Sequence, residues 1–219
     1  MATIVESDRN AVSNKYVPIT VQKGTDMELI VKILAGVAII LAGGLYWNRK
    51  LSALNLELER LSSTDKLTGL CNRMKLDEKF EEEIQRFERF KNPFSVIMVD
   101  VDHFKSVNDT HGHQTGDAVL AQTAKILSEN TRKTDVVGRW GGEEFLILCP
   151  GTDAEGAATV AENLRAAMES ADFGKVGTKT ASFGIAECGE GEQAKDLVAK
   201  ADAALYRAKN AGRNRVEKG

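Results

Sequence analysis

The chain has 219 residues, of which 42% are hydrophobic and 28% are charged. This length fits one domain of about 150 residues with attachments, and the hydrophobic content is high enough for a packed core. With 29 basic and 32 acidic residues the net charge is −3, so no basic excess points to nucleic-acid binding. The three prolines and 19 glycines exclude collagen-like and proline-rich classes.

An apolar run follows a polar start. Residues 1–28 are expected to form a short extracytoplasmic segment, and the 19 residues of 29–47 carry one charge, Lys32, close to one end. As a helix rising about 1.5 Å per residue, the run would cover about 28 Å, close to the thickness of a bilayer core. Aromatic residues end the run and basic residues follow it, which favours the cytoplasm for the C-terminal side. A buried core helix or a signal peptide could show a similar run. We predict one membrane-spanning helix over 29–47, which would place the protein in the inner (cytoplasmic) membrane with its globular part in the cytoplasm.

Leucines recur in the segment that follows. Leu51, Leu54, Leu58 and Leu61 are spaced by three, four and three residues, which is the spacing of the apolar seam of a coiled coil. Two heptads are short, so a dimeric coiled coil and an ordinary amphipathic linker both fit. We expect a helical linker over residues 48–63 that leads into a globular domain over residues 64–219.

Helical and strand patterns interleave through that domain. Apolar residues recur every three to four positions in the helical segments, whereas unbroken apolar or β-branched runs mark the strands. A mixed central sheet with flanking helices is expected, in the α/β or α+β class. Helices are expected over residues 73–91, 116–130, 154–170 and 194–212, strands over 94–102, 135–140, 144–150, 178–188 and 214–217, and a hairpin turn at Gly141 and Gly142.

Two acidic pairs stand where these strands end. Asp100 and Asp102 come at the end of the apolar strand, and two residues apart on a strand they would share a face. Glu143 and Glu144 follow the two glycines of the hairpin. Carboxylates brought together by a sheet suit Mg²⁺, which binds through one or two carboxylates plus substrate phosphates. Acids at strand ends can also be merely solvated, so the pattern alone indicates, rather than defines, a magnesium–nucleotide site.

The longer motifs around these acids resemble those of one family. The pieces are Asp100-Val-Asp-His-Phe-Lys-Ser-Val-Asn-Asp, Arg139-Trp-Gly-Gly-Glu-Glu-Phe, Asp65-Lys-Leu-Thr-Gly-Leu-Cys-Asn-Arg, Ser182-Phe-Gly-Ile-Ala and Ala201-Asp-Ala-Ala-Leu-Tyr-Arg-Ala-Lys-Asn-Ala-Gly-Arg-Asn. In this order they resemble the GGDEF family of diguanylate cyclases, in its GGEEF form, over about residues 62–219. Met74 and His111 depart from the usual pattern, away from the expected chemistry.

The resemblance implies a palm-like nucleotide cyclase fold and a reaction. Two GTP would condense to cyclic di-GMP with release of two pyrophosphates, each GTP held by one domain of a homodimer. The implied cofactor is Mg²⁺, two ions per active site, which Mn²⁺ can replace. The implied partners are GTP, cyclic di-GMP at an inhibitory site, a second copy of the chain and the membrane, with no nucleic acid.

The resemblance also implies roles for individual residues. Asp100, Glu143, Glu144 and the backbone carbonyl of Val101 resemble the metal ligands, and Glu143 resembles the general base. Lys105 resembles the residue that stabilises charge on the transferring phosphate, while Asn108 and Asp117 resemble the guanine readers. The nucleotide site would further include His113, Gly141, Gly142, Lys209 and Arg213, the last two clamping the terminal phosphates from positions four apart on a helix. A solvated loop histidine and an ordinary basic helix end are the alternatives for His113 and for the Lys209–Arg213 pair.

Arg132 and Asp135 match the RxxD inhibitory site of the family, with five residues between Asp135 and Gly141. An arginine can bridge phosphate or guanine and an aspartate can accept from guanine. A surface ion pair is the alternative for this short pattern. Two further functions remain open: a catalytically weak module that binds GTP or cyclic di-GMP and signals, and an adenylate-type or polymerase-like nucleotidyl enzyme. The acidic and lysine residues argue against the first, and Asn108 with Asp117 against the second. The segment from Gly24 resembles the membrane exit of cyclases with a periplasmic sensor, so a short or truncated form of such a protein is expected.

Overall fold

A computed structural model describes residues 23–61 and 63–219. These residues divide into two units, one ending at Asn55 and the other running from Leu56 to Gly219. The expected extracytoplasmic segment, up to residue 22, lies outside the described residues. So do the side chains of Leu58 and Leu61, and with them half of the expected leucine seam.

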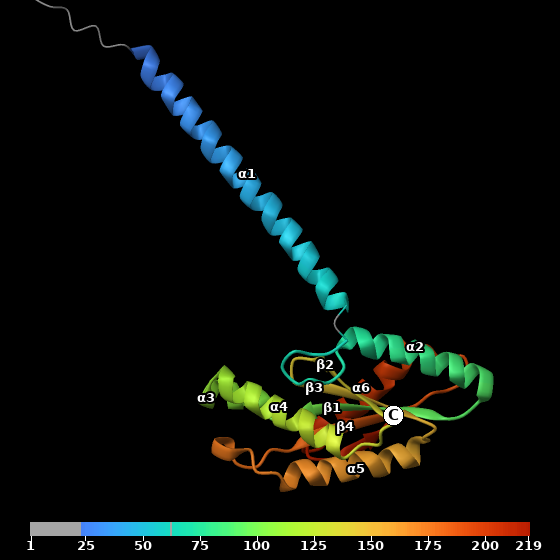
Figure 1. The fold of residues 1–219 in the computed structure, drawn as a ribbon. Helices are drawn as coiled ribbons and strands as arrows, with labels where there is room; N and C mark the ends of the chain where they lie inside the picture. Colours follow the sequence, from blue (N-terminus) through green and yellow to red (C-terminus); the bar gives the residue numbers. More distant parts are fainter. Residues whose placement is uncertain (1–22, 62) are drawn as a thin grey trace, which may run out of the picture. The chain divides into compact units, whose positions relative to one another are not determined.

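The first element is a long helix, α1 (Lys23–Leu61) (Figure 1). It contains the whole apolar run and continues through the leucine segment without a break, which confirms a single apolar helix near the N-terminus. Its stretch from Met27 to Ser52 is long and apolar enough to cross a membrane, by length and composition. Leu51 and Leu54 are 58% and 55% exposed. The side chains of Leu51 and Leu54 are therefore not buried by other parts of the described chain.

The second unit is built on a five-stranded mixed sheet of order β2-β3-β1-β4-β5. The strands are β1 (Phe94–Val101), β2 (Val136–Gly141), β3 (Glu144–Pro150), β4 (Ala181–Glu187) and β5 (Val216–Lys218). Neighbours are antiparallel except β4 and β5, which are parallel. β1 is central and buried along its whole length. Its unbroken apolar run is the pattern expected of a strand that is covered on both faces.

Helices cover both faces of the sheet (Figure 1). Alternate β1 residues Ile97, Val99 and Val101 belong to a core that includes side chains of α3 (Phe104–His111), α4 (His113–Glu129) and α5 (Ala154–Ser170). The intervening Val96 and Met98 pack with side chains of α2 (Arg73–Phe90) and α6 (Ala194–Asn210). A short 3₁₀ turn, η1 (Gly174–Val176), precedes β4. The mixed sheet with flanking helices is the predicted fold class.

Three local predictions are wrong. Residues 104–111 form α3, which was not expected, and α4 begins at His113 instead of residue 116. Gly141 pairs with Glu144 across the hairpin, so the two loop residues are Gly142 and Glu143 and not the two glycines. α6 ends at Asn210, and Arg213 lies beyond it with a φ of 62°. Lys209 and Arg213 are therefore not four apart on one helix.

Candidate active site

The hairpin and the end of β1 bring three carboxylates together. Asp100 lies opposite Glu144 in the β1–β3 ladder. The backbone N–H of the next residue, Val101, donates to the carbonyl of Glu143 at 3.4 Å. Gly142 takes a φ of 31° in the turn, a conformation that residues with a side chain rarely adopt. The sheet register thus places the acids of the two distant motifs side by side, as the sequence predicted.

One cation stands among these acids. Lys209, on the last turn of α6, places its Nζ 2.8 Å from Oδ2 of Asp100. Burial raises the pKa of Asp100, Glu143 and Glu144 above the ordinary value, and the charge of Asp100 raises the pKa of both glutamates further. Lys209 lowers the pKa of all three carboxyl groups. All three pKa values are nevertheless raised, so burial and the neighbouring acids outweigh the lysine.

This donor set fits a hard divalent cation. Asp100, Glu143 and Glu144 offer carboxylate oxygens, the ligand type that Mg²⁺ prefers. Within residues 23–61 and 63–219, no three acidic, histidine or cysteine side chains converge closely enough to hold a metal ion by themselves. A magnesium ion commonly completes its shell with water and substrate phosphate. The arrangement fits that kind of shared site better than a site made of protein ligands alone.

Asp102 is engaged in hydrogen bonds within the domain, unlike the nearby Asp100. It is buried, and its carboxylate accepts from the hydroxyls of Thr180 at 2.6 Å and Ser182 at 2.7 Å and from the N–H of Asn214 at 3.1 Å. These bonds tie the end of β1 to β4 and to the turn after α6. Of the two aspartates expected to share a face, only Asp100 remains available for a ligand.

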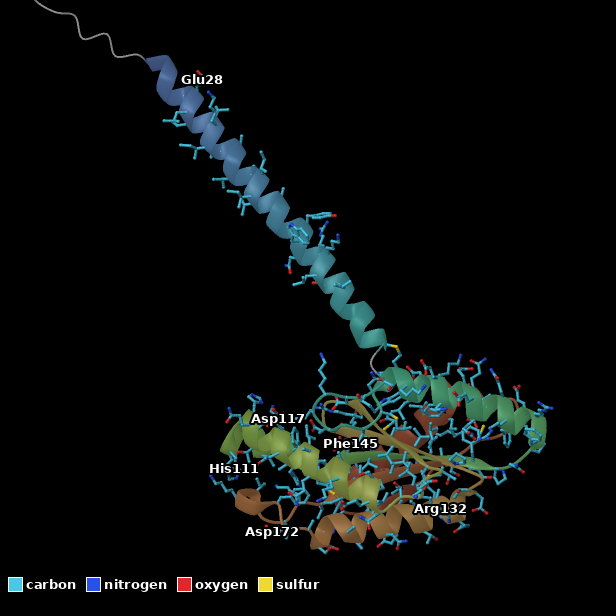
Figure 2. All side chains as sticks on the ribbon, in the orientation of Figure 1. Glu28, His111, Asp117, Arg132, Phe145 and Asp172 are labelled. Carbon is cyan, nitrogen blue, oxygen red and sulfur yellow. The ribbon has the colours of Figure 1, made fainter. Side chains whose placement is uncertain are left out.

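The candidate base pocket lies at the corner between α3 and α4. Asn108 on α3 has a buried Oδ1 with no hydrogen-bond partner. A Cβ at Gly116 would stand 2.0 Å from that oxygen, so the glycine leaves the space that Asn108 fills. Asp117 and His113 are exposed on the first turns of α4, and Lys105 is exposed on the first turn of α3. Figure 2 shows Asp117 and His111 at this same end of the unit. The α3–α4 corner therefore carries the residues assigned to the base, together with Lys105, whereas Lys209 and Arg213 lie beside the acidic cluster.

Arg213 reaches the cluster from the turn after α6. Its N–H donates to the carbonyl of Ala208 at 3.0 Å, and its charge lowers the pKa of Asp100. Lys209 and Arg213 thus both act on Asp100, although the predicted helical spacing is wrong. Gly142, next to the acids in the turn, is exposed.

A contact that the sequence did not predict supports the hairpin. The guanidinium of Arg139 donates to the carbonyl of Gly142 through Nε at 3.1 Å and Nη2 at 2.8 Å. Its Nη1 lies 3.3 Å from Oδ2 of Asp65, in the segment before α2. Asp65 in turn accepts from the N–H and hydroxyl of Thr68. Arg139 therefore connects the segment that follows α1 to the turn that carries Glu143. Both residues stand in the quoted motifs, but nothing local in the sequence indicates that they pair across 74 positions.

The candidate inhibitory residues lie elsewhere in the unit. The backbone N–H of Arg132 donates to Oδ2 of Asp135 at 2.9 Å, which closes the turn before β2. Both residues line a hollow of about 550 Å³ with residues of α5, including Thr159 and Asn163. Figure 2 shows Arg132 far from Asp117, toward the opposite end of α4. The hollow is thus separate from the acidic cluster and its nucleotide corner.

Comparison with known proteins agrees with this architecture. Residues 62–215 match the family model "Diguanylate cyclase, GGDEF domain". The chain is 42% identical to the diguanylate cyclase DgcP of Pseudomonas aeruginosa over 157 residues, which cover 70% of this chain and 23% of DgcP. It is 38% identical to DgcM of Escherichia coli over 160 residues, 73% of this chain and 39% of DgcM. The chain thus spans between about a quarter and two fifths of these relatives.

Solved structures give the same result. The GGDEF domain of DgcB from Caulobacter crescentus, solved in complex with c-di-GMP, matches with a TM-score of 0.69 and 36% identity over 72% of this chain and 95% of that one. The active GGEEF domain of a diguanylate cyclase from Vibrio cholerae matches with a TM-score of 0.65 and 36% identity, covering 68% of this chain and 97% of that one. The fold and the site therefore define a palm-like nucleotide cyclase domain. This chain belongs to the GGDEF family of diguanylate cyclases.

Proposed function

We propose that this chain is a membrane-anchored diguanylate cyclase that condenses two GTP into cyclic di-GMP. The observation that carries the proposal is the meeting of Asp100, Glu143 and Glu144 beside Lys209, on a GGDEF domain whose relatives are diguanylate cyclases. In each half of the reaction, the 3′-hydroxyl of one GTP attacks the α-phosphorus of the other. A 3′–5′ phosphodiester forms, the bond to the β-phosphate breaks, and pyrophosphate leaves.

The chain's own residues divide the work around that step. Glu143 accepts the proton of the attacking hydroxyl, which is a poor nucleophile while it keeps its proton. Lys105 offsets the charge that grows on the α-phosphoryl group, and Lys209 and Arg213 hold the terminal phosphates. Asp100, Glu143, Glu144 and the backbone carbonyl of Val101 would hold two magnesium ions, or manganese in their place. The ions would supply positive charge to the phosphates and to the attacking oxygen. Gly141 and Gly142 let the backbone approach the nucleotide.

Guanine selection is assigned to the corner between α3 and α4. Asp117 can accept from N1 and N2 of guanine, a donor pair that adenine lacks. The buried, unpartnered Oδ1 of Asn108 supports a polar role in the same pocket. His113, exposed on the first turn of α4, is assigned to the edge of this site.

Regulation and assembly complete the proposal. Arg132 and Asp135 would bind the product, cyclic di-GMP, in the hollow at the far end of α4, and so slow the enzyme as product accumulates. A homodimer would form along α1, because each domain holds one GTP and the reaction needs two. The Met27–Ser52 stretch would cross the inner membrane once, with the cyclase domain on the cytoplasmic side.

The test is incubation of the purified full chain with GTP and Mg²⁺, followed by chromatography of the nucleotides. Cyclic di-GMP should appear with GTP, and ATP should give no cyclic dinucleotide. Tight binding of GTP or cyclic di-GMP with no new product would instead favour a signalling module without catalysis.

A further inference from the structure

Two residues with different proposed ligands are paired with each other in this structure. Asp100 is assigned to the metal ion and Lys209 to the phosphates, yet Lys209 Nζ lies 2.8 Å from Asp100 Oδ2. The pair is sheltered: the side chain of Asp100 is 9% exposed and that of Lys209 is 30% exposed. Lys209 therefore uses one of the Asp100 oxygens proposed for the metal ion, and Asp100 uses the ammonium group proposed for the phosphates.

The charges around the pair explain why a cation stands there. Asp100 and Asp202 both raise the pKa of Glu144, and Asp100 also raises that of Glu143. Three cations lower the pKa of these carboxyl groups. Arg213 lowers that of Asp100 and Arg73 lowers that of Glu144. Lys209 lowers the pKa of all three. An acidic cluster in which Asp100 is buried and both glutamates are half-buried is costly without a partner. Lys209 supplies that partner.

A divalent ion that arrives alone meets two obstacles. It must displace the Lys209 ammonium from Asp100, and it finds no three converging protein ligands among the described residues. A nucleotide removes both obstacles at once. Its phosphate oxygens add ligands for the ion, and their negative charge offers Lys209 another partner.

We propose that Lys209 takes the place of the metal ion on Asp100 until a nucleotide arrives, so that divalent-ion binding depends on nucleotide binding through the movement of one ammonium group. This inference rests on the proposed function, because the phosphate partner of Lys209 comes from it. The dependence is reciprocal: whatever factor the nucleotide contributes to metal affinity, the metal contributes to nucleotide affinity.

Mn²⁺ binding to the full chain tests the inference without any turnover. Electron paramagnetic resonance of free Mn²⁺ gives the affinity of the wild type, of Lys209→Met and of Lys200→Met, each without nucleotide. Lys200 is the matched control because it is on the same helix and pairs with a carboxylate outside the cluster, Glu192, at 2.7 Å. We expect Lys209→Met to bind Mn²⁺ about fivefold more tightly than wild type, the upper range for a partly exposed ion pair, and Lys200→Met to match wild type.

Two further measurements show whether the effect of Lys209 on Mn²⁺ affinity depends on Asp100 or only on the removal of a positive charge. In an Asp100→Asn chain, Lys209→Met should no longer tighten Mn²⁺ binding. With saturating 3′-deoxy-GTP, which lacks the attacking hydroxyl, wild type and Lys209→Met should bind Mn²⁺ about equally. The ratio of Mn²⁺ affinity with nucleotide to Mn²⁺ affinity without it should therefore be about fivefold smaller in Lys209→Met than in wild type. Lys209→Gln serves as a second variant, and circular dichroism checks that each chain is folded.

The inference is wrong if folded Lys209 variants bind Mn²⁺ no more tightly than wild type without nucleotide, or if none of these proteins binds it. A wild type that makes no cyclic di-GMP overturns the proposed function and leaves the Mn²⁺ comparison standing. The two failures are therefore distinguishable.

Discussion

Glu143 and Glu144 are adjacent in the sequence but hold different positions in the hairpin. Glu143 is in the two-residue turn, and Glu144 begins β3 opposite Asp100. Glu144 also lies within reach of the charges of Asp202 and Arg73, whereas Glu143 is affected mainly by burial and Asp100. These surroundings support Glu143 as the group that takes the proton and Glu144 as a supporting carboxylate.

We predict that Glu143→Gln lowers cyclic di-GMP formation by at least about 100-fold, the usual contribution of a general base. The same change should raise the melting temperature of the chain at neutral pH, because it removes a charge that burial and the neighbouring Asp100 disfavour. The pKa of Glu143 is raised in the folded state, so wild type loses stability relative to the variant as pH rises through that pKa. At lower pH, where wild type is protonated, the difference in melting temperature should vanish.

Initial rates and thermal melts at several pH values check this prediction. Glu81→Gln, an exposed glutamate on α2, is the control and should change neither quantity. Near-normal turnover by Glu143→Gln would remove Glu143 from the mechanism.

Asp117 gives the second prediction at this scale. Replacement by alanine removes an acceptor for guanine, so GTP affinity should fall by about 5- to 150-fold, corresponding to roughly 1–3 kcal/mol, while ATP affinity stays the same. Competition binding with GTP and ATP measures the ratio, with the exposed Asp77→Ala on α2 as the control. Unchanged selectivity for GTP would contradict the assigned role.

At the scale of elements, the hairpin is held from outside by the segment before α2. Arg139 bridges Asp65 and the carbonyl of Gly142, and its own N–H donates to the carbonyl of Cys71 at 2.8 Å. Since a planar guanidinium can bond both groups at once, lysine is a poor replacement. We predict that Arg139→Lys lowers kcat about tenfold with little change in KM, because the turn that carries Glu143 is less well positioned.

Steady-state kinetics on three chains check this positioning role. Asp65→Asn should act in the same direction, and the double variant should lose little more than either single one, as expected of two residues in one network. Arg207→Lys on α6 is the control. Additive losses, or a change confined to KM, would show that the contact does not position the turn.

The turn before β2 gives a prediction about regulation. Arg132→Ala should keep the initial rate of wild type and lose the slowing that accompanies product accumulation, because its guanidinium is assigned to the product and not to the substrate. Full progress curves, with and without added cyclic di-GMP, give the measurement, and the adjacent exposed Lys133→Ala is the control. Wild type that shows no slowing at micromolar product would mean that the site is absent or incomplete.

Elements also show what sequence patterns can and cannot predict. α2 and α4 carry several turns of apolar period, and apolar residues of that period, such as Leu76 and Leu127, are buried. α3 is short and polar, with only Phe104 and Val107 buried, so it gives too little period to detect. The register shift between Arg139 and Gly141 moves the turn by one residue, and such a shift depends on strand pairing.

The site shows the same division. The acids of the two motifs could be predicted to meet because each ends or begins an apolar strand, and neighbouring strand ends converge. The Asp65–Arg139 pair, the bonds that engage Asp102 and the Lys209–Asp100 ion pair could not, because each joins residues more than 70 positions apart. The four-residue spacing of Lys209 and Arg213 indicated one helix, but α6 ends at Asn210 and the chain turns at Gly212, whose φ is 112°.

At the scale of the whole molecule, the proposed reaction requires two domains to meet, each with one GTP. Tethering them raises their effective concentration to about millimolar for short linkers. We predict that Leu51→Gln with Leu54→Gln lowers the rate and makes the specific activity rise with enzyme concentration, while GTP binding per domain is unchanged. Ser52→Gln, between the two leucines, is the control. A fragment that starts at Ser62 is the comparison. If its specific activity equals that of the full chain at nanomolar concentration, and its rate is first order in enzyme, the leucines do not contribute to dimerisation and serve only as a spacer.

The central claim is that the acidic cluster joins two GTP, and phosphorus-31 NMR of the full chain with GTP and Mg²⁺ tests it most directly. We expect the GTP resonances to be replaced by one phosphodiester signal and by pyrophosphate, at two pyrophosphates for each cyclic dinucleotide. With the Glu143→Gln variant, we expect the GTP resonances to remain as they were at the start. Release of inorganic phosphate without a phosphodiester, or unchanged GTP after long incubation, would contradict the account.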